Sequence, residues 1–281
     1  MVRWLVNALV ASMIFFPTRE YLAEPKDFGL TAEDVWAVTE DSVRIHGWYF
    51  AAAPSGQPPL GQAVPRQPRG TAADGGAGDK ICLVVFHGNA TNISGLLKHA
   101  KEWMGRGVSI LLVDYRGYGA SEGSIKKGTD IFLDAAASVD WLIQQKGLRR
   151  SQIVLYGQSV GSAPAIELAT RDSYRALVLE SAFSSLEELS KIHYGFSPSV
   201  FFRDFPYQNE SKISKIKCPV FMIHGAEDEI CPLWMGKRLF QNAPDPKKLL
   251  EVAGARHNDV MEDRDAFEQP YRFVLELPPP K

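Results

Sequence analysis

The chain alternates two patterns of apolar residues from residue 81 onward. Short continuous apolar runs predict strands at residues 81–86, 108–113, 153–156, 176–179, 220–224 and 249–252. Apolar residues at helical spacing predict helices at residues 92–106, 130–145, 162–170, 234–241 and 258–275. Continuous apolar strands that alternate with amphipathic helices are typical of βαβ units, in which helices cover both faces of a parallel sheet. The pattern predicts an α/β fold.

Before this alternation, residues 34–39 and 43–50 form a predicted strand pair joined by a turn. Residues 51–80 carry five prolines, six glycines and few large apolar residues, so they cannot bury enough surface to offset their ordering entropy. We expect a flexible loop there. A domain boundary is the alternative, but the part of the chain before it is too short for a core of its own. The sequence therefore predicts one domain over residues 25–281, preceded by an apolar segment at 1–24.

The N-terminal segment contains an apolar stretch over residues 4–16, which Pro17 closes. That stretch is shorter than the roughly 20 residues that span a bilayer. It has the length of a signal-peptide core, but no small-x-small cleavage pattern follows it. Three interpretations stay open: a short or interfacial membrane anchor, an uncleaved signal-like segment, and a helix packed on the domain. The localisation is accordingly open between a membrane surface and the cytoplasm.

Residues 184–217 interrupt the alternation of strands and helices and place several aromatic residues among turn formers. A small cap over an active site is the functional interpretation of this segment. A surface excursion that is packed by its own aromatic side chains explains the same pattern equally well.

Composition and charge narrow the class of protein. The chain has 281 residues, 45% hydrophobic and 23% charged, with a formal net charge of -2, which is ordinary for a globular protein and gives no broad basic surface for nucleic acid. The three cysteines, Cys82, Cys218 and Cys231, are widely spaced and predict neither a disulfide framework nor a metal site. We expect Cys231 to lie near the active site, but a better nucleophile is present.

That nucleophile lies in Gly157-Gln158-Ser159-Val160-Gly161, between a predicted strand and a predicted helix. This is the context of the nucleophile elbow, a strained turn that holds a serine hydroxyl above the sheet. Residues two before and two after the serine crowd it, so glycine is favoured at both places. The hydroxyl lies at a helix N-terminus, where developing negative charge is stabilised. We expect Ser159 to be the nucleophile.

A serine hydroxyl needs a general base, and in this type of fold the acid and the histidine follow the serine along the chain. His257 follows the apolar run at 249–252, at the strand end where open α/β sheets place their sites. Asp228 follows the run at 220–224 and is the predicted acid, with Glu227 and Glu229 as alternatives. We expect the strand-ending His87 and His224 to be structural hydrogen-bonding groups.

An oxyanion hole requires two backbone N–H groups. One is expected from Val160, the residue after the nucleophile, and the other from the loop that follows the strand at 81–86. In that loop Gly88 allows a sharp turn, and we expect the Asn89 amide to be the second donor, with Ala90 as the alternative. The mechanism needs no metal and no organic cofactor.

Taken together, these motifs resemble the α/β-hydrolase superfamily, and within it the branch of BEM46-like, ABHD17-like and ABHD13-like proteins. The likeness extends from about Phe28 to the C-terminus. The motifs that carry it are His87-Gly88-Asn89-Ala90, Asp114-Tyr115-Arg116-Gly117-Tyr118-Gly119, Gly157-Gln158-Ser159-Val160-Gly161, His224-Gly225-x-x-Asp228 and His257-Asn258-Asp259.

The resemblance implies hydrolysis of carboxylic esters or thioesters of acyl substrates, often lipids at membranes. ABHD17-like proteins carry a cysteine-rich N-terminus for lipidation, whereas this chain has the apolar stretch at 4–16 instead. The alternatives are a serine peptidase or aminopeptidase with the same triad, a catalytically silent binding protein of the same fold, and a membrane-tethered interaction protein.

Overall fold

The structure is a computed structural model, and it describes residues 2–52, 81–195 and 202–278. The predicted flexible loop at 51–80 therefore lies almost entirely outside the described residues. The same holds for residues 196–201 of the segment at 184–217.

Among the described residues, eight strands form one sheet in the order β1-β2-β4-β3-β5-β6-β7-β8. They are β1 (Glu33–Val38), β2 (Arg44–Phe50), β3 (Cys82–Phe86), β4 (Ser109–Val113), β5 (Ile153–Gln158), β6 (Ala176–Glu180), β7 (Val220–Gly225) and β8 (Lys247–Val252). Strand β2 pairs antiparallel with both β1 and β4, and the remaining neighbours are parallel. Strand β8 is an edge strand that pairs with β7 alone.

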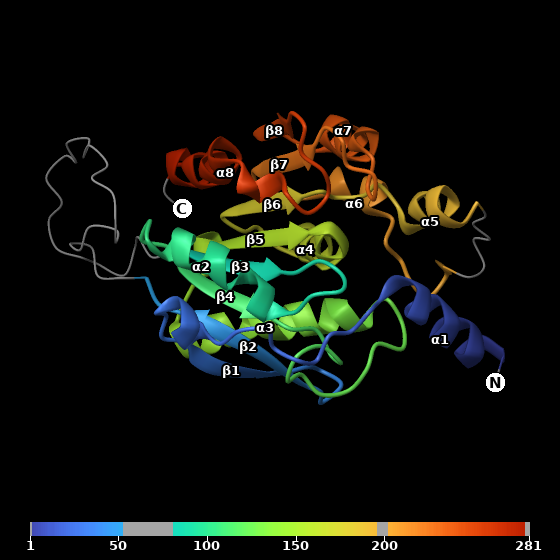
Figure 1. The fold of residues 1–281 in the computed structure, drawn as a ribbon, viewed down its shortest axis with the longest axis horizontal. Coiled ribbons are helices and arrows are strands. Elements are labelled where there is room, and N and C mark those ends of the chain that lie inside the picture. The colour runs from blue at the N-terminus through green and yellow to red at the C-terminus, as the bar shows by residue number, and fades with distance from the viewer. Residues whose placement is uncertain (1, 53–80, 196–201, 279–281) are drawn as a thin grey trace, which may run out of the picture.

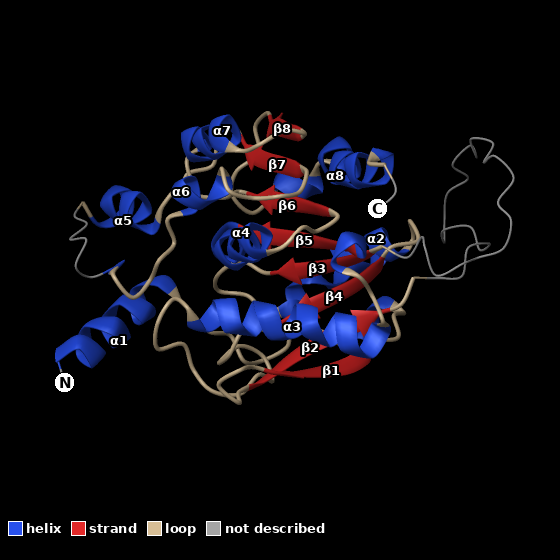
Figure 2. Cartoon of the chain, turned by 180° about the vertical axis from the view of Figure 1, so that it is seen from behind, coloured by secondary structure: helices blue, strands red, loops and turns tan. Residues whose placement is uncertain are grey.

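Helices cover both faces of this sheet, as the alternating pattern predicts (Figures 1 and 2). The helices are α1 (Val2–Ile14), α2 (Leu97–Met104), α3 (Asp130–Lys146), α4 (Ser162–Arg171), α5 (Leu186–Tyr194), α6 (Asn209–Ile213), α7 (Leu233–Asn242) and α8 (Arg264–Glu276). Helices α2 and α8 lie on one face, and α3, α4 and α7 lie on the other.

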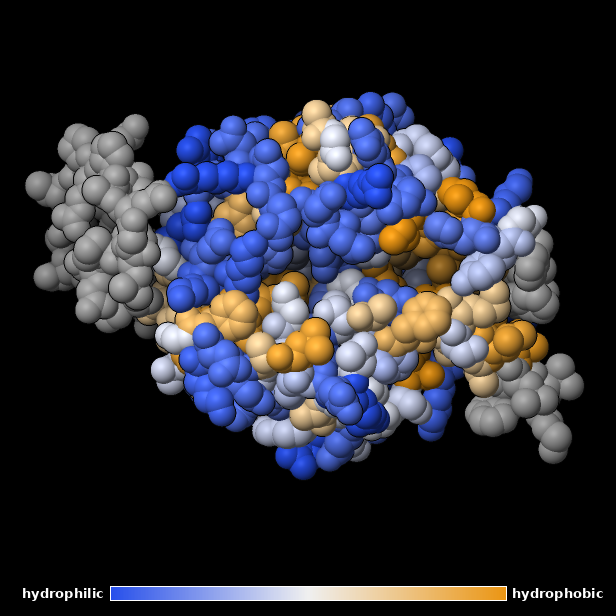
Figure 3. All heavy atoms as spheres, in the orientation of Figure 1, coloured by the Kyte–Doolittle hydropathy of each residue, from blue (hydrophilic) through white to orange (hydrophobic). Residues whose placement is uncertain are grey.

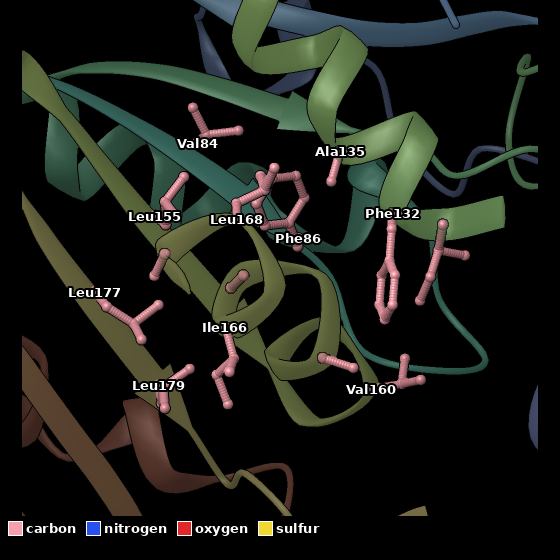
Figure 4. Close-up of a cluster of buried hydrophobic side chains, with 14 of the residues drawn as sticks. Val84, Phe86, Phe132, Ala135, Leu155, Val160, Ile166, Leu168, Leu177 and Leu179 are labelled. Atoms are coloured by element: carbon pink, nitrogen blue, oxygen red, sulfur yellow. The ribbon is translucent and has the colours of Figure 1, made fainter. Parts of the chain in front are cut away.

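The core consists of two apolar layers, one on each face of the sheet. Val84 and Phe86 of β3 contribute to the layer under α3 and α4, which Figure 4 shows, whereas Leu83 and Val85 contribute to the layer under α2 and α8. Alternate residues of one strand point to opposite faces, so a strand that is covered on both sides must be apolar throughout. This explains the continuous apolar runs in the sequence.

Helix ends differ from the sequence prediction where a side chain caps the backbone. The predicted helix at 258–275 begins only after Asp263, because the Asp263 carboxylate accepts a hydrogen bond from the Ala266 amide and so caps α8. At the start of the predicted helix at 92–106, the Asn92 side chain accepts from the Ser94 amide. A short 3₁₀ turn, Ile93–Leu96, then precedes α2.

The N-terminal helix α1 packs against the domain beyond the carboxyl ends of the parallel strands, on the same side as α5 (Figures 1 and 2). Val10, Ala11 and Phe15 are buried, and the Phe15 ring meets the Tyr207 ring edge to face. In the part of the chain that the structure describes, no helix has the length and apolar character that a membrane crossing requires.

Within the segment at 184–217, the residues that follow the undescribed part join the main core. Phe205 and Tyr207 are fully buried, and the Tyr207 hydroxyl donates to the Gly128 carbonyl at 2.9 Å. Helix α5 stands at the surface instead and exposes Ile192 and Tyr194.

Candidate active site

Ser159 occupies a sharp turn between β5 and α4. Its φ angle of +50° lies in the left-handed region, which costs an L-residue about 1–2 kcal/mol. The flanking glycines make the turn sterically allowed. A Cβ on Gly157 would lie 2.5 Å from the Gly161 carbonyl oxygen, and a Cβ on Gly161 would lie 2.1 Å from that of Phe86. The spacing of glycines in the sequence thus has the steric cause that the elbow pattern predicts.

The structure brings the three predicted catalytic side chains together from three strand ends. Ser159 follows β5, Asp228 follows β7 and His257 follows β8. His257 Nε2 lies 3.0 Å from Ser159 Oγ. His257 Nδ1 lies 2.8 Å from Asp228 Oδ2 and 3.0 Å from Oδ1. The histidine and the aspartate are buried, and the serine residue is half-buried.

Asp228 is held as a carboxylate. Burial opposes its ionisation, but hydrogen bonds from His224, His257 and the Cys231 amide outweigh burial and hold the pKa of Asp228 well below its usual range. Its Oδ1 accepts from the amides of Ile230 at 2.9 Å and Cys231 at 2.7 Å. The alternatives Glu227 and Glu229 are exposed, as are most loop carboxylates.

The predicted structural histidines form hydrogen bonds inside the protein. His224 Nε2 lies 2.6 Å from the Cys231 carbonyl oxygen and 3.3 Å from Asp228 Oδ2, so it stabilises the turn that carries Asp228. His87 Nδ1 lies 2.7 Å from the Gly88 carbonyl oxygen, in the loop after β3.

Cys231 is fully buried beside the predicted nucleophile, and its thiol interacts with the Ser159 side chain. Burial raises the pKa of the Cys231 thiol well above its usual value, so the sulfur stays neutral. A neutral, buried thiol does not compete with the serine as a nucleophile.

In the loop after β3, hydrogen bonds distinguish between the candidate oxyanion donors. The Gly88 amide donates to Gln158 Oε1 at 3.2 Å, and the Ala90 amide donates to Asn89 Oδ1 at 2.9 Å. Among the described residues the Asn89 amide has no such acceptor. The Val160 amide lies in the first turn after the elbow, where backbone N–H groups lack intrahelical partners. Of the three loop amides, Asn89 is therefore the one for which the described residues show no acceptor, and it remains the predicted oxyanion donor.

Sequence reasoning missed a buried polar group beside this loop. Gln158 and Glu180 are paired at the carboxyl ends of β5 and β6, and Gln158 Nε2 donates to Glu180 Oε1 at 3.1 Å. The Tyr156 hydroxyl donates to the other carboxylate oxygen. Burial raises the pKa of Glu180 above its ordinary value. The signal in the sequence was a polar residue at the same end of two neighbouring apolar strands, which parallel pairing brings together.

The strand order and the elbow define the α/β-hydrolase fold, and comparison with known proteins agrees. The chain is similar in structure to an esterase of Pyrococcus furiosus, Pf2001, with a TM-score of 0.69 and 18% identity over 94% of this chain and 97% of that one. Residues 78–198 match the profile of the family described as serine aminopeptidase, S33. The predicted fold class is confirmed.

Proteins that are similar in sequence show which branch of the superfamily the chain belongs to. The chain is 30% identical to the Mycobacterium tuberculosis protein Rv2307c over 266 residues, which is 94% of this chain and 86% of that protein. It is 36% identical over 205 residues to human alpha/beta hydrolase domain-containing protein 17B, covering 69% of this chain and 66% of that protein. The chain belongs to the α/β-hydrolase superfamily and is a hydrolase. Within the superfamily it is an ABHD17-like α/β-hydrolase, which confirms the resemblance seen in the sequence motifs.

Proposed function

We propose that the chain hydrolyses carboxylic ester or thioester bonds of acyl substrates through an acyl-enzyme on Ser159. The observation that carries this proposal is the continuous contact from Ser159 Oγ through His257 to Asp228, with 3.0 Å on one side of the imidazole and 2.8 Å on the other. A hydroxyl within hydrogen-bond reach of a base that a third group orients is the arrangement of an activated nucleophile.

In the acylation half, His257 Nε2 takes the Ser159 proton while the serine oxygen attacks the acyl carbonyl carbon. Asp228 holds the imidazole with its Nδ1 proton facing the carboxylate and stabilises the imidazolium that forms. The carbonyl oxygen becomes an oxyanion that accepts from the Asn89 and Val160 amides. Loss of one such donor typically costs about 3 kcal/mol of transition-state stabilisation. His257 then protonates the leaving alkoxide or thiolate.

In the deacylation half, His257 takes a proton from water, which attacks the acyl-serine carbonyl. The tetrahedral intermediate rests on the same two amides. Its collapse releases the carboxylic acid, and the proton returns from His257 to Ser159. Each half needs only the groups of this chain and water.

Apolar side chains on the side of the molecule where α1 and α5 lie support an acyl or lipid-like substrate (Figure 3). Large apolar residues are exposed on α1 and just after it, on α5, on the turn after Asp228 and at the start of α7, and they are Leu9, Phe16, Ile192, Tyr194, Ile230 and Trp234. Contiguous exposed apolar groups are typical of lipid or ligand contact surfaces. We propose that an acyl chain lies against them and that the N-terminal segment meets the lipid phase when the substrate is membrane-borne.

A second candidate is a serine peptidase, because the matching family is described as a serine aminopeptidase. The same triad attacks amides, so the leaving group decides between the two. A catalytically silent binding protein is the third candidate.

The experiment is labelling of the full chain with a fluorophosphonate probe. Wild type should be labelled and Ser159→Ala should not, while the exposed hydroxyl variant Ser173→Ala should behave as wild type. A panel of acyl esters, acyl thioesters and aminoacyl anilides, in solution and in phosphatidylcholine vesicles, then ranks the substrate classes. Turnover of the anilides alone would replace the proposal with the peptidase. A folded wild type without labelling would favour the silent binding protein.

A further inference from the structure

The side chain of Asn89 joins the N-terminal segment to the loop that carries the proposed oxyanion donor. Its Oδ1 accepts from the Phe16 amide at 2.9 Å, and its Nδ2 donates to the Ile14 carbonyl at 2.5 Å. The same Oδ1 accepts from the Ala90 amide at 2.9 Å and from the Tyr118 hydroxyl at 3.0 Å. The Asn89 carboxamide therefore bonds both to the backbone at the end of α1 and to its own loop.

The loop needs such an external restraint. Ala90 has a φ of +55°, a conformation that costs an L-residue free energy and that the loop adopts only if its surroundings enforce it. The Gly88 amide is fixed by Gln158 on one side, and the Ala90 amide is fixed by the Asn89 side chain on the other. The direction of the Asn89 N–H, which lies between them, thus depends on where the Asn89 side chain is held.

The N-terminal segment is itself firmly placed against the domain. At the start of α1, Arg3 pairs with Asp204, and Asn7 Nδ2 donates to the same carboxylate at 2.9 Å. Beyond α1, Asn92 Nδ2 donates to the carbonyl of Thr18 at 3.1 Å and to that of Glu20 at 2.7 Å. The Ile14–Phe16 backbone, to which Asn89 bonds, is therefore held against the domain on both sides.

We propose that Asn89 is a positioning residue that makes the placement of α1 a condition for a working oxyanion hole. The inference rests on the proposed function, because it concerns the same Ser159 reaction. The N-terminal segment then belongs to the catalytic apparatus, although none of its side chains is one of the three catalytic groups.

The expected signature follows from when an oxyanion donor acts. The donor binds the transition state more strongly than the substrate, so displacing it lowers kcat and leaves KM nearly unchanged. A misplacement of about 1 Å can cost about a hundredfold in rate. Asn89→Ala keeps the backbone N–H and removes only the side chain that aims it, so we expect a loss in kcat of at least about tenfold. A short soluble ester serves as the substrate, because its turnover does not depend on contacts with a long acyl chain.

The coupling to α1 is tested from the other partner. Phe16→Pro removes the amide proton that Asn89 Oδ1 accepts, and Phe16→Ala removes the same ring but keeps that proton. We expect kcat for Phe16→Pro to fall at least about fivefold below that for Phe16→Ala in the wild-type background. In the Asn89→Ala background this difference should vanish, because both changes act through one contact. Tyr118→Phe removes a single donor to Asn89 Oδ1 and supplies a milder variant if Asn89→Ala does not fold.

The outcomes separate this inference from the proposed function. If wild type labels at Ser159 but Asn89→Ala and Tyr118→Phe both turn over as wild type does, the positioning role is wrong and the hydrolase proposal stands. If Asn89→Ala is slow but Phe16→Pro equals Phe16→Ala, Asn89 acts within its loop alone and the part assigned to α1 is overturned. Equal Pro-to-Ala ratios in both backgrounds would also overturn it. Absence of Ser159 labelling in wild type would instead refute the proposed function.

Discussion

Replacing Asp228 by asparagine gives the sharpest test of the proposed mechanism, because the contacts around the carboxylate favour one orientation of the new amide. Oδ1 accepts from the Ile230 and Cys231 amides at 2.9 and 2.7 Å, so the asparagine must keep its carbonyl oxygen there. Its NH₂ group then takes the place of Oδ2, the oxygen nearer to His257 Nδ1 at 2.8 Å, while the retained carbonyl oxygen, at 3.0 Å from Nδ1, already accepts from two backbone amides. The opposite orientation would set NH₂ against two backbone donors.

A donor in front of Nδ1 reverses the histidine tautomer. Nδ1 must become the acceptor, so the single imidazole proton moves to Nε2, which faces Ser159 Oγ at 3.0 Å. A protonated Nε2 cannot take the serine proton. In other triads this change lowers kcat by about 10⁴-fold, which corresponds to about 5 kcal/mol in activation free energy. We expect a loss of that order for Asp228→Asn.

The assay is kcat for a short p-nitrophenyl ester, with thermal unfolding to show that the variant is folded. Glu227→Gln is the matched control, since it removes a carboxylate from the same turn and that side chain is exposed. We expect Glu227→Gln to stay within about twofold of wild type, because exposed charges are largely screened. A loss below tenfold in Asp228→Asn would refute the assignment and direct the search for the acid to Glu180, the buried carboxylate at the end of β6.

Two further predictions concern stability. Gly161→Ala should destabilise the fold by more than about 3 kcal/mol or prevent folding, because its Cβ would lie 2.1 Å from the Phe86 carbonyl oxygen. Gly254→Ala is the control: its φ is +73°, but no atom lies within 4 Å of the new Cβ, so it should cost only about 1 kcal/mol. Equal losses of unfolding free energy in urea denaturation would contradict the steric argument. Burial raises the pKa of Glu180 above its ordinary 4.5, so the folded state holds this proton more tightly than the unfolded state, and the stability contributed by the protonated group is lost as pH rises from about 4.5 through the raised folded pKa. Glu180→Gln should therefore gain stability relative to wild type over that window, measured by urea denaturation at several pH values, and a constant difference across pH would speak against the raised pKa.

Much of the fold was predictable because its sheet is buried on both faces. Continuous apolar runs such as that at 81–86 indicate buried strands. The glycines at 157 and 161 indicate a tight turn, because larger side chains would not fit there. The positions of Ser159, Asp228 and His257 relative to strand ends followed from the same alternation, since parallel strands deliver their loops to one edge.

What the sequence did not reveal depends on side chains that meet only in three dimensions. The contact between Asn89 and the Ile14 carbonyl joins residues 75 positions apart, and no periodicity predicts it. The apolar stretch at 4–16 supported three interpretations because a helix packed on a domain and a short anchor share one composition. The helix starts were displaced by Asn92 and Asp263, whose capping geometry becomes apparent only once the backbone is placed.

His257 lies in the loop that follows β8, an edge strand of the sheet. Among the strands that the structure describes, β8 has one neighbour, whereas β5, which precedes the serine, has neighbours on both sides. Proteins open in parts, and elements with a single partner are generally released before those in the interior. A local opening that separates β8 from β7 would move His257, the proposed base, away from Ser159 and leave the serine in place. Heating would then abolish the proposed Ser159 reaction while most of the sheet is still folded. Loss of activity would therefore report the opening of this edge strand and not global unfolding.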